Sequence, residues 1–112
     1  MQLDYLPIDK SELKKQPERF AVELAGDNYV FVVRWNEVGE FFAFDMYDDE
    51  GDPLLFGRRI TYGVDMLADV LEYVDIVPVA KSEGADVERN GITFDNFMNQ
   101  VKPYIFERDN ND

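Results

Sequence analysis

Residues 19–62 contain apolar runs of strand length, and the first of these runs alternates apolar and polar residues with the period of two that is typical of β-strands. Turn-forming residues divide this stretch into four apolar runs, at 19–24, 29–35, 41–47 and 54–61. Because each run follows the previous one across a short turn, the pattern predicts a continuous antiparallel meander of four strands. We expect the other segments to pack onto this meander.

The two middle runs carry apolar residues on both faces of their predicted strands. Asp45 alone interrupts the second face of the run 41–47, and pairing with an arginine such as Arg34 or Arg58 is its expected role. A strand that is apolar on both faces needs a cover on each side. Either the sheet closes into a barrel or a partner subunit covers the second face, and the sequence leaves both alternatives open.

The segments before and just after the meander predict short elements. Residues 3–8 alternate as an edge strand would. Residues 9–18 are charged and predict a linker, with one helical turn capped by Ser11 as the alternative. Apolar residues in 64–71 recur at helical spacing, which predicts a short amphipathic helix or helical turn. Residues 75–80 alternate again, with Pro78 favouring an edge or a bulge.

The C-terminal part predicts a loop, a helix and a last strand. Residues 81–91 are polar and predict a loop. Thr93 is a candidate N-cap, the apolar residues that follow it are spaced as on a helix, and Pro103 provides a stop, so a short helix is expected between them. Residues 104–106 can pair as a final strand.

These elements together predict a mainly β fold: a small antiparallel barrel or sandwich built on a meander, with one or two short helices. A chain of 112 residues has room for a single core. We therefore expect one β-rich domain over residues 1–107, followed by a flexible polar tail at 108–112.

Composition narrows the range of partners. The chain has 24 acidic and 11 basic residues, and its formal net charge is −13. This charge repels nucleic acids, so a direct nucleic-acid partner is not expected. The sequence has no cysteine, no apolar run long enough to span a bilayer and no signal-peptide pattern at its start, so we expect neither disulfides nor membrane insertion.

Candidate catalytic and metal-binding residues are few. The chain has no histidine and no cysteine, and its only serines, Ser11 and Ser82, lie in predicted loops, so we expect no enzyme activity and no cofactor. The acidic stretch 48–52 invites interpretation as part of a twelve-residue calcium-binding loop with Gly51 at its sixth position. The first and twelfth positions, which should carry acidic ligands, then fall on Met46 and Gly57, so the motif fails at both ends. A hairpin turn is the favoured interpretation of this stretch, and no metal site is expected.

Three segments carry a family resemblance. They are Tyr47 to Val64, which ends in Ile60-Thr61-Tyr62-Gly63-Val64, then Ile76-Val77-Pro78-Val79, and then Gly91-Ile92-Thr93-Phe94-Asp95-Asn96-Phe97. In this order they resemble the cyanophage baseplate plug family, small proteins encoded among phage and prophage tail genes. The resemblance covers residues 3–106. It implies a structural protein at the central hub of the baseplate of a phage-like, contractile tail, which helps to close the tube before infection and has no catalytic residue.

The functional expectation is therefore a non-enzymatic structural or assembly component of a phage-like tail baseplate. It would assemble in the host cytoplasm, end in a virion tail or tail-like particle, and contact a tail hub protein or a second copy of itself. The candidate interface residues, from the segment where the resemblance is densest, are Phe56, Arg58, Ile60 and Tyr62. The alternative is an acidic module that inhibits a basic host protein by nucleic-acid mimicry.

Overall fold

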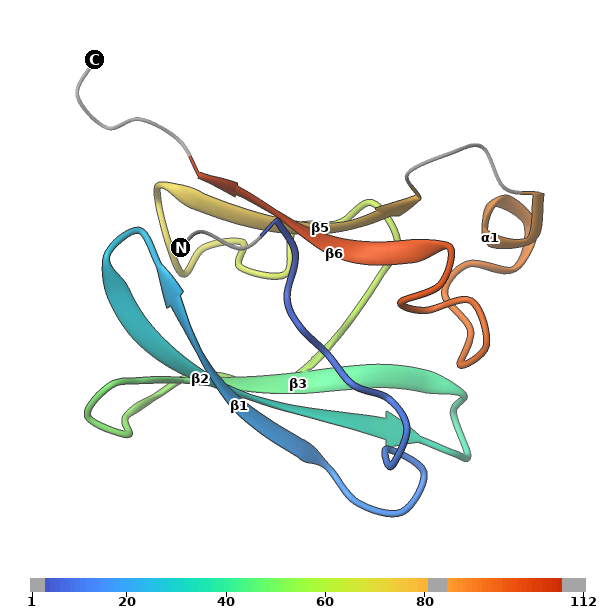
Figure 1. Cartoon of the computed structure of the whole chain (residues 1–112), viewed down its shortest axis with the longest axis horizontal. Helices are drawn as coiled ribbons and strands as arrows, with labels where there is room; N and C mark the ends of the chain where they lie inside the picture. The colour runs from blue at the N-terminus through green and yellow to red at the C-terminus, as the bar shows by residue number, and fades with distance from the viewer. Residues whose placement is uncertain (1–3, 81–84, 108–112) are drawn as a thin grey trace.

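The chain folds into two facing layers of antiparallel strands (Figure 1). The structure, a computed structural model, describes residues 4–80 and 85–107. Its elements in chain order are β1 (Glu18–Leu24), β2 (Asp27–Asn36), β3 (Phe41–Asp48), β4 (Pro53–Arg59), β5 (Val74–Ala80), α1 (Ala85–Asn90) and β6 (Val101–Glu107). One sheet has the order β1-β2-β3-β4, and the other contains β5 and β6. The predicted mainly β fold is confirmed as a sandwich built on a meander, and the two sheets do not close into a barrel.

Short turns fix the register of the four-stranded sheet. Leu24 lies opposite Asp27, and the two residues between them, Ala25 and Gly26, have φ of 51° and 89°. Positive φ at both central positions is the type I′ geometry, whose twist matches that of the strands it joins. At the β2–β3 turn, a Cβ on Gly39 would lie 2.4 Å from the Phe41 ring, so any larger residue here would force that ring to move.

The second layer accommodates two prolines in one strand pair. Pro78 of β5 lies directly opposite Pro103 of β6. The Pro78 carbonyl accepts from Gly63 N at 2.7 Å and the Pro103 carbonyl accepts from Leu6 N at 3.0 Å, so both carbonyls point away from the partner strand. Proline has no N–H to donate, and neither proline lies at a position where the strand pair needs an N–H donor. Both prolines are therefore tolerated. The expected edge position of Pro78 is confirmed.

The N-terminal segment lies beside β6 over a short distance. Tyr5 forms an isolated bridge with Tyr104, and Ile105 N donates to the Asp4 carbonyl at 2.8 Å. The predicted edge strand at 3–8 is thus reduced to a single bridge within the described residues, and Leu3 lies outside them.

Of the two alternatives predicted at 64–71, the amphipathic helix does not form, whereas a helical turn does: Leu71 N donates to the Leu67 carbonyl at 3.4 Å within a run of turns. Asp65 Oδ1 accepts from Leu67 N and from Ile76 N, both at 2.9 Å, and Met66 N donates to the Ile76 carbonyl at 2.7 Å. The segment is therefore tied to the edge of β5. Asp69 has a φ of 68°, which a right-handed helix does not contain.

The C-terminal helix prediction is also wrong. Residues 94–100 form turns, and Met98 has a φ of 71°. The α-helix in the described part of the chain is α1, which lies within the predicted polar loop 81–91; Lys81 to Gly84 of that loop lie outside the described residues.

Aromatic side chains fill the space between the layers. The Phe31 ring stacks on Phe20 and on Phe44, each with 5.8 Å between ring centroids. The Phe42 ring lies 4.5 Å from Phe97, whose turn closes one end of the core. These contacts run across the four-stranded sheet and join it to the segment before β6.

Candidate interaction surface

The four-stranded sheet has one covered face and one open face. Its inner face packs against the second layer through residues such as Phe31, Phe44 and Met46, which have no exposed surface. Figure 1 shows β5, β6 and α1 on this same side of the sheet. The strand register places the following residues on the opposite side, called here the outer face: Arg19, Ala21, Glu23, Val30, Val32, Arg34, Phe41, Ala43, Asp45, Tyr47 and Arg59.

Asp45 organises the centre of the outer face. Its Oδ2 accepts from Arg34 Nη2 at 2.6 Å and its Oδ1 accepts from Gly57 N at 2.7 Å. The Asp45 side chain keeps only 2% of its surface exposed, whereas Arg34 keeps 38%. The predicted pairing of Asp45 with Arg34 is confirmed. A buried carboxylate is stable here because it has both an ion pair and a backbone donor.

The Gly57 donor exists because β4 bulges. Phe44 pairs with Arg58 and Met46 with Leu55, so two residues of β4, Phe56 and Gly57, oppose the single residue Asp45. Gly57 takes a φ of 67°, which glycine adopts without steric cost. The bulge aims the Gly57 N–H at the carboxylate.

The four predicted interface residues do not share one surface. Phe56 is 74% exposed, whereas Ile60 is only 2% exposed and belongs to the core. The Arg58 guanidinium donates to the carbonyls of Met66 at 3.3 Å and Ala68 at 2.9 Å, which ties β4 to the turns after it. Tyr62 is half-buried in those turns. The interface role of these residues stays a prediction.

Sequence reasoning about single residues missed most of the outer face. Val30, Val32 and Tyr47 are half-buried there, and Ala43 is 7% exposed although β5 and β6 lie on the other side. The available signal was the apolar character of both faces of the two middle strands.

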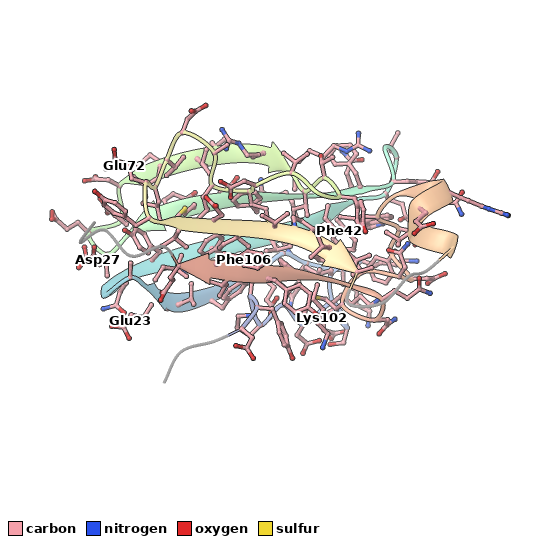
Figure 2. All side chains as sticks on the ribbon, turned by 90° about the horizontal axis from the view of Figure 1, so that it is seen from above. Glu23, Asp27, Phe42, Glu72, Lys102 and Phe106 are labelled. Carbon is pink, nitrogen blue, oxygen red and sulfur yellow. The ribbon has the colours of Figure 1, made fainter. Side chains whose placement is uncertain are left out.

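Acidic residues gather at one end of the strands. The acidic end is defined here by the β1–β2 and β3–β4 turns and the turn before β5; its acidic residues are Glu23, Asp27, Asp48, Asp49, Glu50, Asp52 and Glu72. Figure 2 labels Glu23, Asp27 and Glu72 at this end, away from Lys102. Burial raises the pKa of the Tyr29 phenol, and the nearby carboxylates of Asp27, Asp49 and Asp48 raise the pKa further. The local potential at this end is therefore negative.

The predicted hairpin turn at 48–52 is confirmed. Asp48 Oδ1 accepts from Glu50 N at 3.0 Å and from Asp52 N at 2.8 Å, while Asp48 N donates to the Asp52 carbonyl at 2.9 Å. The Asp48 carboxylate thus holds the turn in shape. Among the described residues, no group of three or more acidic side chains is arranged to hold a metal ion.

A hollow of about 550 Å³ lies at the opposite end of the strands. Trp35 Nε1 donates to the Glu37 carboxylate there, and the Lys14 ammonium lies 4.6 Å from the centre of the Phe94 ring. The Trp35 ring also lies 5.1 Å from the Phe94 ring, and this contact joins β2 to the turns before β6. No helix within residues 4–80 and 85–107 is long and apolar enough to cross a membrane.

Comparison with known proteins identifies the family. The family model described as "Cyanophage baseplate Pam3 plug gp18" matches residues 3–108, which is nearly the whole chain. A search of curated proteins found no match. The match contains every strand of both sheets and the segments whose sequence resembles the plug family. The chain therefore belongs to the cyanophage baseplate plug family.

Proposed function

We propose that this protein is a structural plug seated at the central hub of a phage-like tail baseplate, where it helps to close the tail tube through protein contacts. The observation that carries the proposal is the family match over residues 3–108, because it includes both layers and the turns between them. With this placement, the protein would join the tail during assembly in the host cytoplasm and then remain in the finished particle.

The architecture suits such a role. A plug must keep its shape when neighbouring subunits press on it, and this chain has a continuous aromatic core with Phe31, Phe42 and Phe97 fully buried. Close-packed interiors have low compressibility and transmit strain. The four-stranded sheet then provides a broad face on which another protein can dock.

The alternative of nucleic-acid mimicry is less well supported. Mimicry would require carboxylates in regularly spaced rows along the surface. The acidic residues of the described chain gather instead in turns, as in 48–52, whereas the strands carry apolar residues on the outer face. A structural role accounts for both features.

The test is whether the protein is part of a tail. We expect mass spectrometry of purified tails from its own phage or prophage to detect the chain at a much lower copy number than the tube protein. Co-expression with the hub protein of the same tail locus should give a complex that co-elutes in size exclusion. A chain that is absent from purified tails and never co-elutes with the hub protein would overturn the proposal.

A further inference from the structure

An apolar row crosses all four strands of the outer face, on the side of the sheet nearer the acidic end. Ala21 lies opposite Val30, Val30 opposite Tyr47, and Tyr47 opposite Pro53. Phe56, 74% exposed, lies on β4 beside the neighbouring row of outer-face residues, which contains Val32 and Asp45. Figure 1 shows β5, β6 and α1 on the other side, so within the described chain none of these elements covers the row. Ala21 and Pro53 are exposed at the two ends of the row, and half-buried Val30 and Tyr47 join them. Apolar surface that is contiguous and left uncovered can mark an interaction site.

The charges near this row do not oppose burial. Asp45 is the acidic residue closest to the middle of the sheet, and it already has Arg34 at 2.6 Å and Gly57 N at 2.7 Å as partners. Burying an unpaired charge is costly, whereas a hydrogen-bonded pair can be covered at far lower cost. A partner can therefore close over the centre without having to neutralise Asp45.

Opposite charges lie on the two sides of the row. On β1, Arg19 and Glu23 flank Ala21 at two residues' distance on either side, and both are exposed. On β4, exposed Arg59 lies on the Arg19 side, whereas the acidic turn 48–52 lies on the Glu23 side. The face is thus basic on one side of the apolar row and acidic on the other.

This distribution is self-complementary under one symmetry operation. A two-fold axis that follows the apolar row, across the strands, reverses the strand direction of the second copy. It places Arg19 over the partner's Glu23 and Arg59 over the partner's acidic turn, while the two apolar rows meet on the axis. A uniformly basic partner would be repelled by the arginine side of the face, and a uniformly acidic partner by the other side.

From these features we infer that the outer face pairs with the same face of a second copy of this chain, with the apolar rows stacked and the acidic side of each copy over the arginine side of the other. Such an isologous contact closes as a dimer. The inference does not depend on a place in the baseplate.

The size of the face predicts a weak dimer. Four strands spaced about 4.8 Å apart and about seven residues long, at about 3.4 Å per residue, cover roughly 450 Å² of flat area per copy. Standard stable interfaces bury about 800 Å² per partner. We therefore expect a dissociation constant in the micromolar range, so that both species are present at workable concentrations.

Sedimentation velocity across a concentration series, from low micromolar upward, tests the inference. The weight-average mass of the parent chain should rise from that of the monomer towards twice that value. Phe56→Ser and Val32→Glu should weaken the association at least tenfold. Val38→Glu is the matched control, because Val38 is 96% exposed in the β2–β3 turn, outside the outer face, and this variant should behave as the parent does.

A charge exchange on β1 tests the orientation. Arg19→Glu alone and Glu23→Arg alone should each weaken the dimer, because each places like charges opposite one another. The double variant exchanges the two charges and should restore the parent's dissociation constant. Restoration supports the axis that follows the apolar row, whereas a double variant weaker than either single one overturns it.

Two results would overturn self-pairing altogether. One is a parent chain that stays monomeric throughout the series. The other is a dimer that Phe56→Ser and Val32→Glu leave unchanged, since it would use another surface. A monomer that binds a hub protein through Phe56 would assign the outer face to a different partner, and would leave the proposed baseplate function standing.

Discussion

At the scale of single residues, Asp45 shows how a polar group becomes acceptable on a half-buried sheet face. Its carboxylate has two partners that reach it from different strands, Arg34 on β2 and Gly57 in the β4 bulge. The sequence predicted the arginine, because an acid among aromatic residues needs a counter-charge. It did not predict the Gly57 N–H, since a bulge depends on how two strands pair, which the sequence of one strand does not specify.

Replacing Asp45 should destabilise the sheet. Asp45→Ala leaves Gly57 N without its acceptor and Arg34 without its counter-ion, and we expect a loss of about 1–3 kcal/mol, since Arg34 is partly solvated and can recover water. Urea unfolding followed by tryptophan fluorescence measures this loss. Asp45→Asn is the matched control: it keeps an oxygen for Gly57 N and should lose less. An Asp45→Ala variant with the parent's unfolding midpoint would show that the network contributes nothing.

Tyr29 reports the potential at the acidic end. Burial raises the pKa of its phenol above the ordinary value of 10.0, and Asp27, Asp49 and Asp48 raise it further. The folded state therefore favours the neutral phenol. Its contribution to stability is fully present below the unfolded pKa, near 10, and is lost as the pH rises through the higher folded pKa.

The Tyr29 titration can be measured by NMR of ring carbons labelled at Cζ. We expect the pKa of Tyr29 to lie above that of an ordinary tyrosine. Asp27→Asn should lower this pKa, because Asp27 contributes more to it than Asp49 or Asp48 does. Glu40→Gln, which changes an exposed acid in the β2–β3 turn at the opposite end of the strands, serves as the control. A Tyr29 pKa that does not respond to Asp27→Asn would show that the Asp27 carboxylate does not contribute to the raised pKa.

At the scale of elements, the segment 93–101 shows why a helix pattern can end as a single turn. Asn96 N donates to Thr93 Oγ1 at 3.1 Å and Thr93 N donates to Asn96 Oδ1 at 2.9 Å, the reciprocal contacts with which a helix begins. The chain leaves this geometry at Met98, where φ is 71°. Asn96 Nδ2 also donates to the Gly91 carbonyl at 2.9 Å, which closes the turn on itself.

Strands and turns were predictable to different extents. The four strands of the meander follow from alternation within each run and from short turns, and both signals are local. The segments 64–71 and 93–101 carry equally local helical spacing, but in each of them one backbone donor departs from the helical pattern. Met66 N donates to the Ile76 carbonyl of β5, and Met98 N donates to the Val101 carbonyl. Tertiary pairing overrides a short helix, because helices of only a few turns are marginal by themselves.

Phe97 is buried in the core although the helix predicted around it does not form. Its side chain has no exposed surface and its ring lies 4.5 Å from Phe42. Phe97→Ala should therefore cost about 3–5 kcal/mol, as other buried phenylalanine truncations do. Phe106→Ala, on a side chain that is 49% exposed, is the matched control and should cost clearly less. Equal unfolding midpoints for the two variants would place the 93–101 turn outside the cooperative core.

At the scale of the whole molecule, the net charge lowers the stability of the folded state, whereas the buried core raises it. The net charge of −13 is spread over 112 residues, and much of it is concentrated at the acidic end. Self-repulsion of this kind destabilises the compact state, because unfolding moves like charges apart. Arg34 pairs with Asp45 and exposed Lys15 pairs with Glu12, but 24 acidic residues outnumber 11 basic ones, so screening should weaken repulsion more than attraction.

Added NaCl should therefore stabilise the monomer. Screening shortens the range of the repulsion to about 8 Å at physiological ionic strength. A gain of 1 kcal/mol corresponds to about 4–8 °C in Tm for a domain of this size, so we expect a rise of a few degrees between low salt and physiological salt. The measurement belongs at protein concentrations low enough to keep the chain monomeric. The double variant Asp49→Asn, Asp52→Asn removes two charges from the acidic end, and its Tm should depend less on salt. A parent Tm that falls with added NaCl would mean that attraction, not repulsion, dominates the electrostatics of this fold.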